Sequence, residues 1–155
     1  MADQLAVSSK ITDFTLDPVL ARDCHELGDL NGHHLLLMDN SLVPWFILVP
    51  ETTVTELCDL PDHVSEPLNT AVRQLCLHVR ENWPVEKLNV AAIGNVVRQL
   101  HIHIVGRHHE DYCWPGVVWG RSEKSPYRLD QVDDIQSALR QSLGGSFSGR
   151  PPHQV

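Results

Sequence analysis

The stretch Gln99–Val105 carries two histidines, two residues apart, in an otherwise apolar run. In a β-strand, alternate side chains share a face, so Gln99, His101 and His103 would lie side by side with the apolar residues behind them. Imidazole changes charge near neutral pH and serves as a nucleophile or general base. The spacing therefore indicates a chemical or metal-binding site, against the plainer alternative of an edge strand with two solvated histidines.

The length and composition predict one folded domain. The chain has 155 residues, of which 42% are hydrophobic and 21% charged, as in an ordinary globular protein. We expect residues 1–145 to form a single domain with a loose start over 1–10. Residues 146–155 are rich in Gly, Ser and Pro, which predicts a mobile tail.

The net charge of -8 argues against nucleic acid as a partner. A small anionic ligand stays compatible with it, because local donors hold a single phosphate. The four cysteines show no CxxC spacing, which favours reduced thiols; they are Cys24, Cys58, Cys76 and Cys113. No leader or bilayer-spanning apolar run is found, so we expect a cytoplasmic location and no membrane partner.

The apolar periodicity predicts three helices and four strands. The helices are expected at 12–27, 64–81 and 129–143, and the strands at 34–38, 45–49, 87–93 and 96–107. This order predicts an α+β fold, an antiparallel sheet with helices packed mainly on one face. The face with Gln99, His101 and His103 is then expected to be open to a ligand.

One interpretation of the histidines is covalent catalysis. A neutral nitrogen of His101 would attack phosphorus, provided that the other ring nitrogen keeps its proton. A backbone carbonyl or a carboxylate would fix that tautomer. His103 and Gln99, one on each side, would donate hydrogen bonds to phosphate oxygens.

Two other interpretations stay open at this point. His101 and His103 would serve as zinc ligands if His108, His109 or Cys113 completed the set, since zinc needs three or four protein ligands. Alternatively, the histidine face recognises a ligand without reacting with it.

The segment Gly94–Val105 resembles the signature of the histidine triad (HIT) superfamily, in which three histidines alternate with apolar residues after a Gly-Gln-Ser/Thr stretch. The resemblance puts His101 on the central histidine, the nucleophile, and His103 on the third, a phosphate contact. Gln99 stands in place of the first histidine, and Val96 in place of the hydroxyl residue. Each departure removes a donor or a positive charge from the transition state.

The resemblance extends over residues 12–108 and implies further contacts. Asn95 falls on the glutamine of the stretch and would hold phosphate oxygens. Asp39 would hold the ribose hydroxyls, with Asn40 in that role if the hairpin alignment shifts by one. Asn89 resembles the polar residue that precedes the loop over the phosphates.

Two segments after the motif have more than one interpretation. Arg107, with His108 and His109, forms a basic cluster that either steers a polyphosphate or is a solvated strand end. The segment Trp114–Trp119 resembles a bacterial, hydrolase-like branch of the superfamily. Its tryptophans would stack on a base, line a dimer groove or fill the core.

The resemblance implies a nucleotide hydrolase or transferase, acting at the α-phosphate of a nucleoside polyphosphate or phosphoramidate through a nucleotidyl-histidine. It implies a small nucleotide as partner and a homodimer. No cofactor or metal is required, although Mg²⁺ is compatible with a polyphosphate substrate. The alternatives are a nucleotide-binding or regulatory protein with little turnover, which Gln99 and Val96 favour, and a metal-dependent enzyme.

Overall fold

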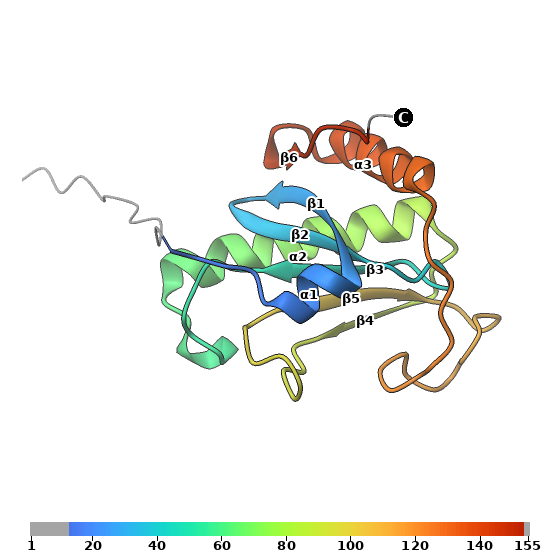
Figure 1. Cartoon of the computed structure of the whole chain (residues 1–155), viewed down its shortest axis with the longest axis horizontal. Helices are drawn as coiled ribbons and strands as arrows, with labels where there is room; N and C mark the ends of the chain where they lie inside the picture. Colours follow the sequence, from blue (N-terminus) through green and yellow to red (C-terminus); the bar gives the residue numbers. More distant parts are fainter. Residues whose placement is uncertain (1–12, 154–155) are drawn as a thin grey trace, which may run out of the picture.

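The computed structural model describes residues 13–153. Its centre is a six-stranded antiparallel sheet in the order β4-β5-β3-β2-β1-β6 (Figure 1). The strands are β1 (Cys24–Leu30), β2 (His33–Met38), β3 (Trp45–Val49), β4 (Lys87–Ala91), β5 (Ile102–Arg107) and β6 (Phe147–Gly149).

Two long helices cover one face of the sheet (Figure 1). Helix α2 (Asp62–Asn82) packs against β3 and β5, and α3 (Leu129–Leu143) packs against α2 and β6. The short α1 (Pro18–Asp23) buries Leu20 on the other face. Two single 3-10 turns, η1 (Leu57–Asp59) and η2 (Gly144–Ser146), complete the elements.

The sheet is buried on both faces. Leu35 and Leu37 of β2 pack beneath the helices. Leu36, between them, points to the other face and packs with Ile47 and Val105. A strand buried on both sides needs apolar residues at every position, which explains the unbroken apolar run of β3.

Most of the predicted elements are confirmed, and with them the α+β fold with an antiparallel sheet. The expected helix 64–81 lies within α2, 129–143 coincides with α3, and the strands 34–38, 45–49 and 87–93 correspond to β2, β3 and β4. No helix of the described part of the chain has the length and apolar character to cross a bilayer. All four cysteines are free thiols, as their spacing predicts.

The helix expected over 12–27 is wrong for most of its length. Of the described residues 13–27, only Pro18–Asp23 are helical, and the chain then continues as β1. A bulge between Glu26 and Gly28 shifts the register of β1 against β2. The bulge breaks the two-residue alternation, so that Leu27 and Leu30 are both buried at a spacing that looks helical.

The expected strand 96–107 is shorter in the structure. Strand β5 starts at Ile102, which pairs with Leu48 near the end of β3. Beyond Val49, Pro50 offers no N–H to a neighbour, so the residues before Ile102 have no ladder to join. His101 therefore lies at the entrance to the strand, outside the regular hydrogen-bonding pattern.

The expected tail also contains a strand. Residues 147–149 form β6, which pairs with β1, and Phe147 is buried in the main core. Gly28 permits this contact, because a Cβ at that position would lie 2.1 Å from the Ser148 carbonyl oxygen. The expected loose start over residues 1–10 lies outside the described residues.

Candidate active site

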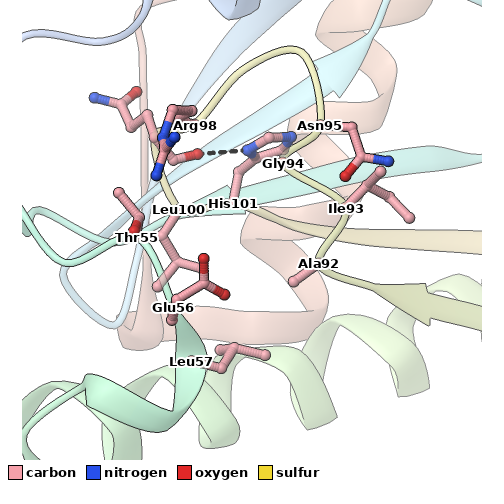
Figure 2. A pocket seen from close by; sticks show the side chains of 11 residues that line it. Thr55, Glu56, Leu57, Ala92, Ile93, Gly94, Asn95, Arg98, Leu100 and His101 are labelled. Carbon is pink, nitrogen blue, oxygen red and sulfur yellow. Dashed lines mark hydrogen bonds between the residues drawn. The ribbon is translucent and has the colours of Figure 1, made fainter.

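His101 lies in the wall of a cavity of about 500 Å³ between two loops (Figure 2). The loop before β5 supplies most of the wall, and the segment before α2 supplies the opposite side. The lining residues are Thr55, Glu56, Leu57, Ala92, Ile93, Gly94, Asn95, Arg98, Gln99, Leu100 and His101. We refer to this space as the His101 cavity.

One hydrogen bond fixes the orientation and tautomer of His101. Its Nδ1 lies 2.6 Å from the backbone oxygen of Gln99, the contact drawn as a dashed line in Figure 2. A carbonyl only accepts, so Nδ1 carries the proton, and the neutral ring has its lone pair on Nε2. The ring is 6% exposed, so the surrounding protein holds it in place. This is the tautomer that a nucleophilic Nε2 requires.

His103 is buried and neutral. Trp45 Nε1–H donates a 2.9 Å hydrogen bond to its Nδ1, which places the ring proton on Nε2. Burial, together with the nearby His101, lowers the pKa of His103 to about 3. The ring centres of His101 and His103 are 4.8 Å apart. His103 therefore offers an N–H donor beside His101 without a positive charge.

The expectation of an open histidine face is correct only in part, because His101 and His103 each line a cavity but the face itself is covered. His103 and Val105 are buried beneath residues that follow β5, among them Cys113 and Val118. Trp119 lies edge-on to His103, with ring centres 5.4 Å apart. The apolar segment after the motif therefore packs over the polar face of β5, which the strand pattern alone does not reveal.

A second cavity, of about 320 Å³, lies on the His103 side of the pair. We refer to it as the His103 cavity. It contains Asn40 in its wall, together with Trp45, Trp119 and Lys124. The Asn40 amide already bonds the segment before α3, since its Oδ1 accepts from Ser125 N–H and its Nδ2 donates to the Glu123 carbonyl.

Asp39, the expected ribose contact, is not in the wall of either cavity. Its Oδ1 accepts hydrogen bonds from His25 Nε2 and from the backbone N–H of Tyr127, both at 2.9 Å. Burial opposes the charged form, but these two bonds outweigh it and lower the pKa of Asp39. The structure thus places Asn40, the alternative one residue along, beside the histidines, and the ribose role of Asp39 stays a prediction.

The Gln99 side chain bonds the protein backbone, whereas the sequence predicts that it donates to a phosphate oxygen. Its side-chain Oε1 accepts from Asp17 N–H and its Nε2 donates to the Thr15 carbonyl, each at 2.9 Å. The amide therefore binds the backbone before α1.

Asn95, in contrast, lines the His101 cavity, and its contact with phosphate oxygens stays a prediction. Besides His101, the ionisable side chains of that wall are Arg98 and Glu56, which the sequence reasoning passed over. The available signal for Arg98 is its position, a cation three residues before His101.

Comparisons with known proteins agree with this geometry. A family model described as "HIT domain" matches residues 21–110. The chain belongs to the HIT domain family. No curated protein sequence matches it.

Three histidine triad proteins of known structure are similar to the chain. The one from Marinobacter aquaeolei VT8 is 37% identical, with a TM-score of 0.79, over 84% of this chain and 96% of that one. The one from Bradyrhizobium japonicum is 33% identical, with a TM-score of 0.79, over 84% and 98%. The one from Sinorhizobium meliloti 1021 is 32% identical, with a TM-score of 0.81, over 85% and 98%.

Arg107 and Asn89 lie outside both cavities of this HIT domain. Arg107 is 1% exposed and pairs with Asp111 at 2.6 and 3.0 Å. It also donates to Asn89 Oδ1 and to the Gly116 carbonyl. These partners occupy the guanidinium, which holds the loop after β5 against the sheet, in place of the expected contact with a polyphosphate.

The surroundings of the two histidines do not favour the alternative of a zinc site. The Nδ1 atoms of His101 and His103 are both engaged, by a carbonyl and by Trp45. Within residues 13–153, no group of three or more His, Cys, Asp or Glu side chains is arranged to hold a metal ion. His108 and His109, offered as further ligands, lie beyond the end of β5, where His109 bonds Glu86.

Replacing Asp111 by Asn is expected to destabilise the domain strongly. The Arg107–Asp111 pair is almost fully buried, with side chains 1% and 0% exposed, and the substitution leaves the guanidinium without its counter-charge. We expect a loss of about 3–5 kcal/mol in the free energy of unfolding, measured by urea denaturation. Asp130→Asn, in the exposed pair with Arg128, is the control and should change little. Equal losses of unfolding free energy in the two variants would show that the buried Arg107–Asp111 pair stabilises the domain no more than the exposed pair does.

The low pKa of His103 predicts a loss of stability in acid. The folded ring stays neutral down to about pH 3, whereas an unfolded imidazole binds a proton near 6.5. Between these values the unfolded state holds the extra proton, so stability falls as the pH falls. His103→Gln keeps an acceptor for Trp45 and should flatten this slope by up to about 1.4 kcal/mol per pH unit.

The measurement is urea unfolding between about pH 4 and pH 7, the range in which this linkage acts. Burial also lowers the pKa of His33 and His78, so the comparison is the difference between variant and wild type. The exposed His63→Gln is the matched control. A His103→Gln slope that equals the wild-type slope would show that His103 titrates normally.

Proposed function

We propose that this HIT domain is a nucleotide hydrolase or transferase that acts at the α-phosphate of a nucleoside polyphosphate or phosphoramidate. The observation that carries the proposal is the His101 ring, held with Nδ1–H on the Gln99 carbonyl, which leaves the lone pair of the neutral ring on Nε2. Membership of the family supports it, as do the neutral donor His103 and the amide of Asn95 in the wall of the cavity.

The proposed reaction has two displacements. The Nε2 lone pair of His101 attacks the α-phosphorus, an N–P bond forms, and the bond to the leaving group breaks. The leaving group takes that electron pair, together with a proton from water where it is an amine. Water then attacks the same phosphorus and releases a proton, which replaces the one taken up by an amine leaving group. The N–P bond breaks, and its electrons return to Nε2. The products are a nucleoside monophosphate and the free imidazole.

The surrounding groups have distinct roles in this scheme. The N–P intermediate leaves a positive charge on the imidazole, which the Gln99 carbonyl stabilises through Nδ1–H. His103 Nε2–H and the Asn95 amide donate to phosphate oxygens. The nucleoside extends past His103 toward Asn40, where Trp119 supplies an apolar wall. None of these roles needs a metal, and Mg²⁺ would accompany only a polyphosphate substrate.

The first test is a covalent adduct on His101. Brief incubation with an adenosine phosphoramidate or a dinucleoside polyphosphate, without acid, is expected to raise the intact mass of the wild type by one adenylate. His101→Ala removes the nucleophile and should show neither adduct nor product. His63→Ala, an exposed histidine of α2, is the matched control and should behave like the wild type.

The same experiment separates the two main functions. Product formation and an adduct that depend on His101 support the enzyme. Tight binding of adenosine monophosphate, without adduct or product from any of these substrates, supports a nucleotide-binding protein with little turnover.

We also propose a homodimer, which the family resemblance implies. Exposed apolar side chains at the sheet edge support it, since Val90 of β4 is 45% exposed and Ile93 is 42% exposed. Light scattering after size exclusion should give twice the chain mass. Val90→Lys with Ile93→Lys should give the mass of one chain if this edge forms the interface. An unchanged dimer in the double variant would place the interface elsewhere.

A further inference from the structure

Gln99 is bonded at three points, and two of them join segments that lie far apart in the sequence. Its backbone oxygen accepts from His101 Nδ1–H, and its side chain bonds Thr15 and Asp17. We infer that Gln99 is a positioning residue, whose side chain holds its own carbonyl against His101 and does not contact the substrate. The predicted effect on the rate of the reaction rests on the proposed function, whereas the predicted effect on the His101 tautomer does not.

The carbonyl of residue 99 needs such a support because no strand holds it. Strand β4 ends at Ala91 and β5 begins at Ile102, so the intervening loop has no ladder of backbone hydrogen bonds. Val97 and Leu100 anchor this loop by burial, at 8% and 4% exposure. Two apolar anchors fix the path of the loop, but they do not set the direction of the peptide group between them.

The partner of the Gln99 amide is itself firmly held. Asp17 caps α1, its Oδ1 accepting a 2.8 Å hydrogen bond from Val19 N–H. Leu20 of the same helix is buried with Ile47 of β3 on the sheet. The amide of Gln99 therefore connects the nucleophile loop to an element that packs against the centre of the sheet.

An amide suits this connection for a chemical reason. It must donate to the Thr15 carbonyl and accept from Asp17 N–H at the same time, and a neutral amide does both at every pH. A carboxylate would accept from Asp17 but repel the Thr15 oxygen. A histidine in the charged form would lose its acceptor. Gln99 thus keeps the position of its carbonyl independent of pH.

The consequence for His101 concerns its tautomer. With the carbonyl in place, the neutral ring carries its proton on Nδ1 and its lone pair on Nε2. If the carbonyl moves away, both neutral tautomers are populated and the ring turns more freely. A ring with Nε2–H cannot attack phosphorus through that nitrogen.

The test compares Gln99→Ala and Gln99→Glu with the wild type in two independent measurements. Nitrogen NMR of the histidine side chains at about pH 8, above the usual imidazole range, reports the tautomer of His101 without any turnover. We expect Nδ1–H in the wild type and a mixture in both variants. The rate of adduct formation should fall about 10- to 100-fold, the loss usual when a supporting hydrogen bond is removed, with KM little changed. Gln141→Ala, an exposed glutamine of α3, is the matched control.

A second pair of variants tests the same connection from its other end. Asp17→Pro removes the N–H that bonds Gln99, at a residue whose φ of -53° proline adopts. Asp17→Ala also loses the cap of α1 but keeps that N–H. We expect Asp17→Pro to shift the His101 tautomer and to slow the adduct beyond Asp17→Ala. Gln99→Ala should have a smaller effect in the Asp17→Pro background than in the wild type, because Asp17→Pro has already removed one of the two side-chain hydrogen bonds of Gln99.

The outcomes are distinguishable. If the adduct slows in Gln99→Ala while the His101 tautomer stays wild-type, Gln99 acts on the substrate and the inference is wrong. If neither measurement changes, the connection has no positioning role and the inference is again wrong. If the tautomer shifts in the variants but the wild type forms no adduct, the inference holds for the site and the proposed reaction fails.

Discussion

The 2.6 Å hydrogen bond between His101 Nδ1 and the Gln99 carbonyl determines what this site can do. A neutral imidazole has one proton for two nitrogens, so any group that fixes the proton on Nδ1 also fixes the lone pair on Nε2. The backbone oxygen does so without a charge of its own. A carboxylate in its place would add negative charge beside an incoming phosphate, in a protein whose net charge is already -8.

His103, like the Gln99 carbonyl, brings no charge to the site. Burial between the sheet and Trp119 keeps this ring neutral, so it contributes a directed N–H and no positive charge. The indole of Trp45 decides which nitrogen carries that proton. Arg98 is the permanently cationic side chain in the wall of the His101 cavity, and Glu56 lies in the same wall. Recognition of an anion here depends mainly on placed donors, which act locally whatever the net charge.

The sequence was informative wherever one local pattern decided the structure. The apolar periodicity of α2 and α3 and the uniform apolar run of β3 located these elements, because each follows from one buried face or two. The spacing of His101 and His103 likewise predicted that the two rings are neighbours. The pattern failed where contacts distant in sequence decided the outcome. The bulge in β1, the pairing of β6 and the covering of His103 by residues after β5 all depend on partners that no local window contains.

The expected substrate contacts divide in the same way. Asn95 is close to the motif and lies in the cavity, whereas Arg107 is equally close but buried with Asp111, because a charge on an inward face must find a counter-charge. Asp39 bonds His25 on the neighbouring strand β1, a contact that depends on the packing of the whole sheet.

Two histidines of one short segment thus depend on the whole fold. The segment before α1 holds the loop through Gln99, β3 supplies Trp45, and the chain after β5 supplies Trp119. Each of these contacts sets a different property: the tautomer of His101, the tautomer of His103 and the burial of the His103 ring. A single strand could present the same residues, but it could not set their proton positions. The motif locates the two histidines, and the packing of distant segments around it gives His101 a lone pair on Nε2 and makes His103 a neutral donor.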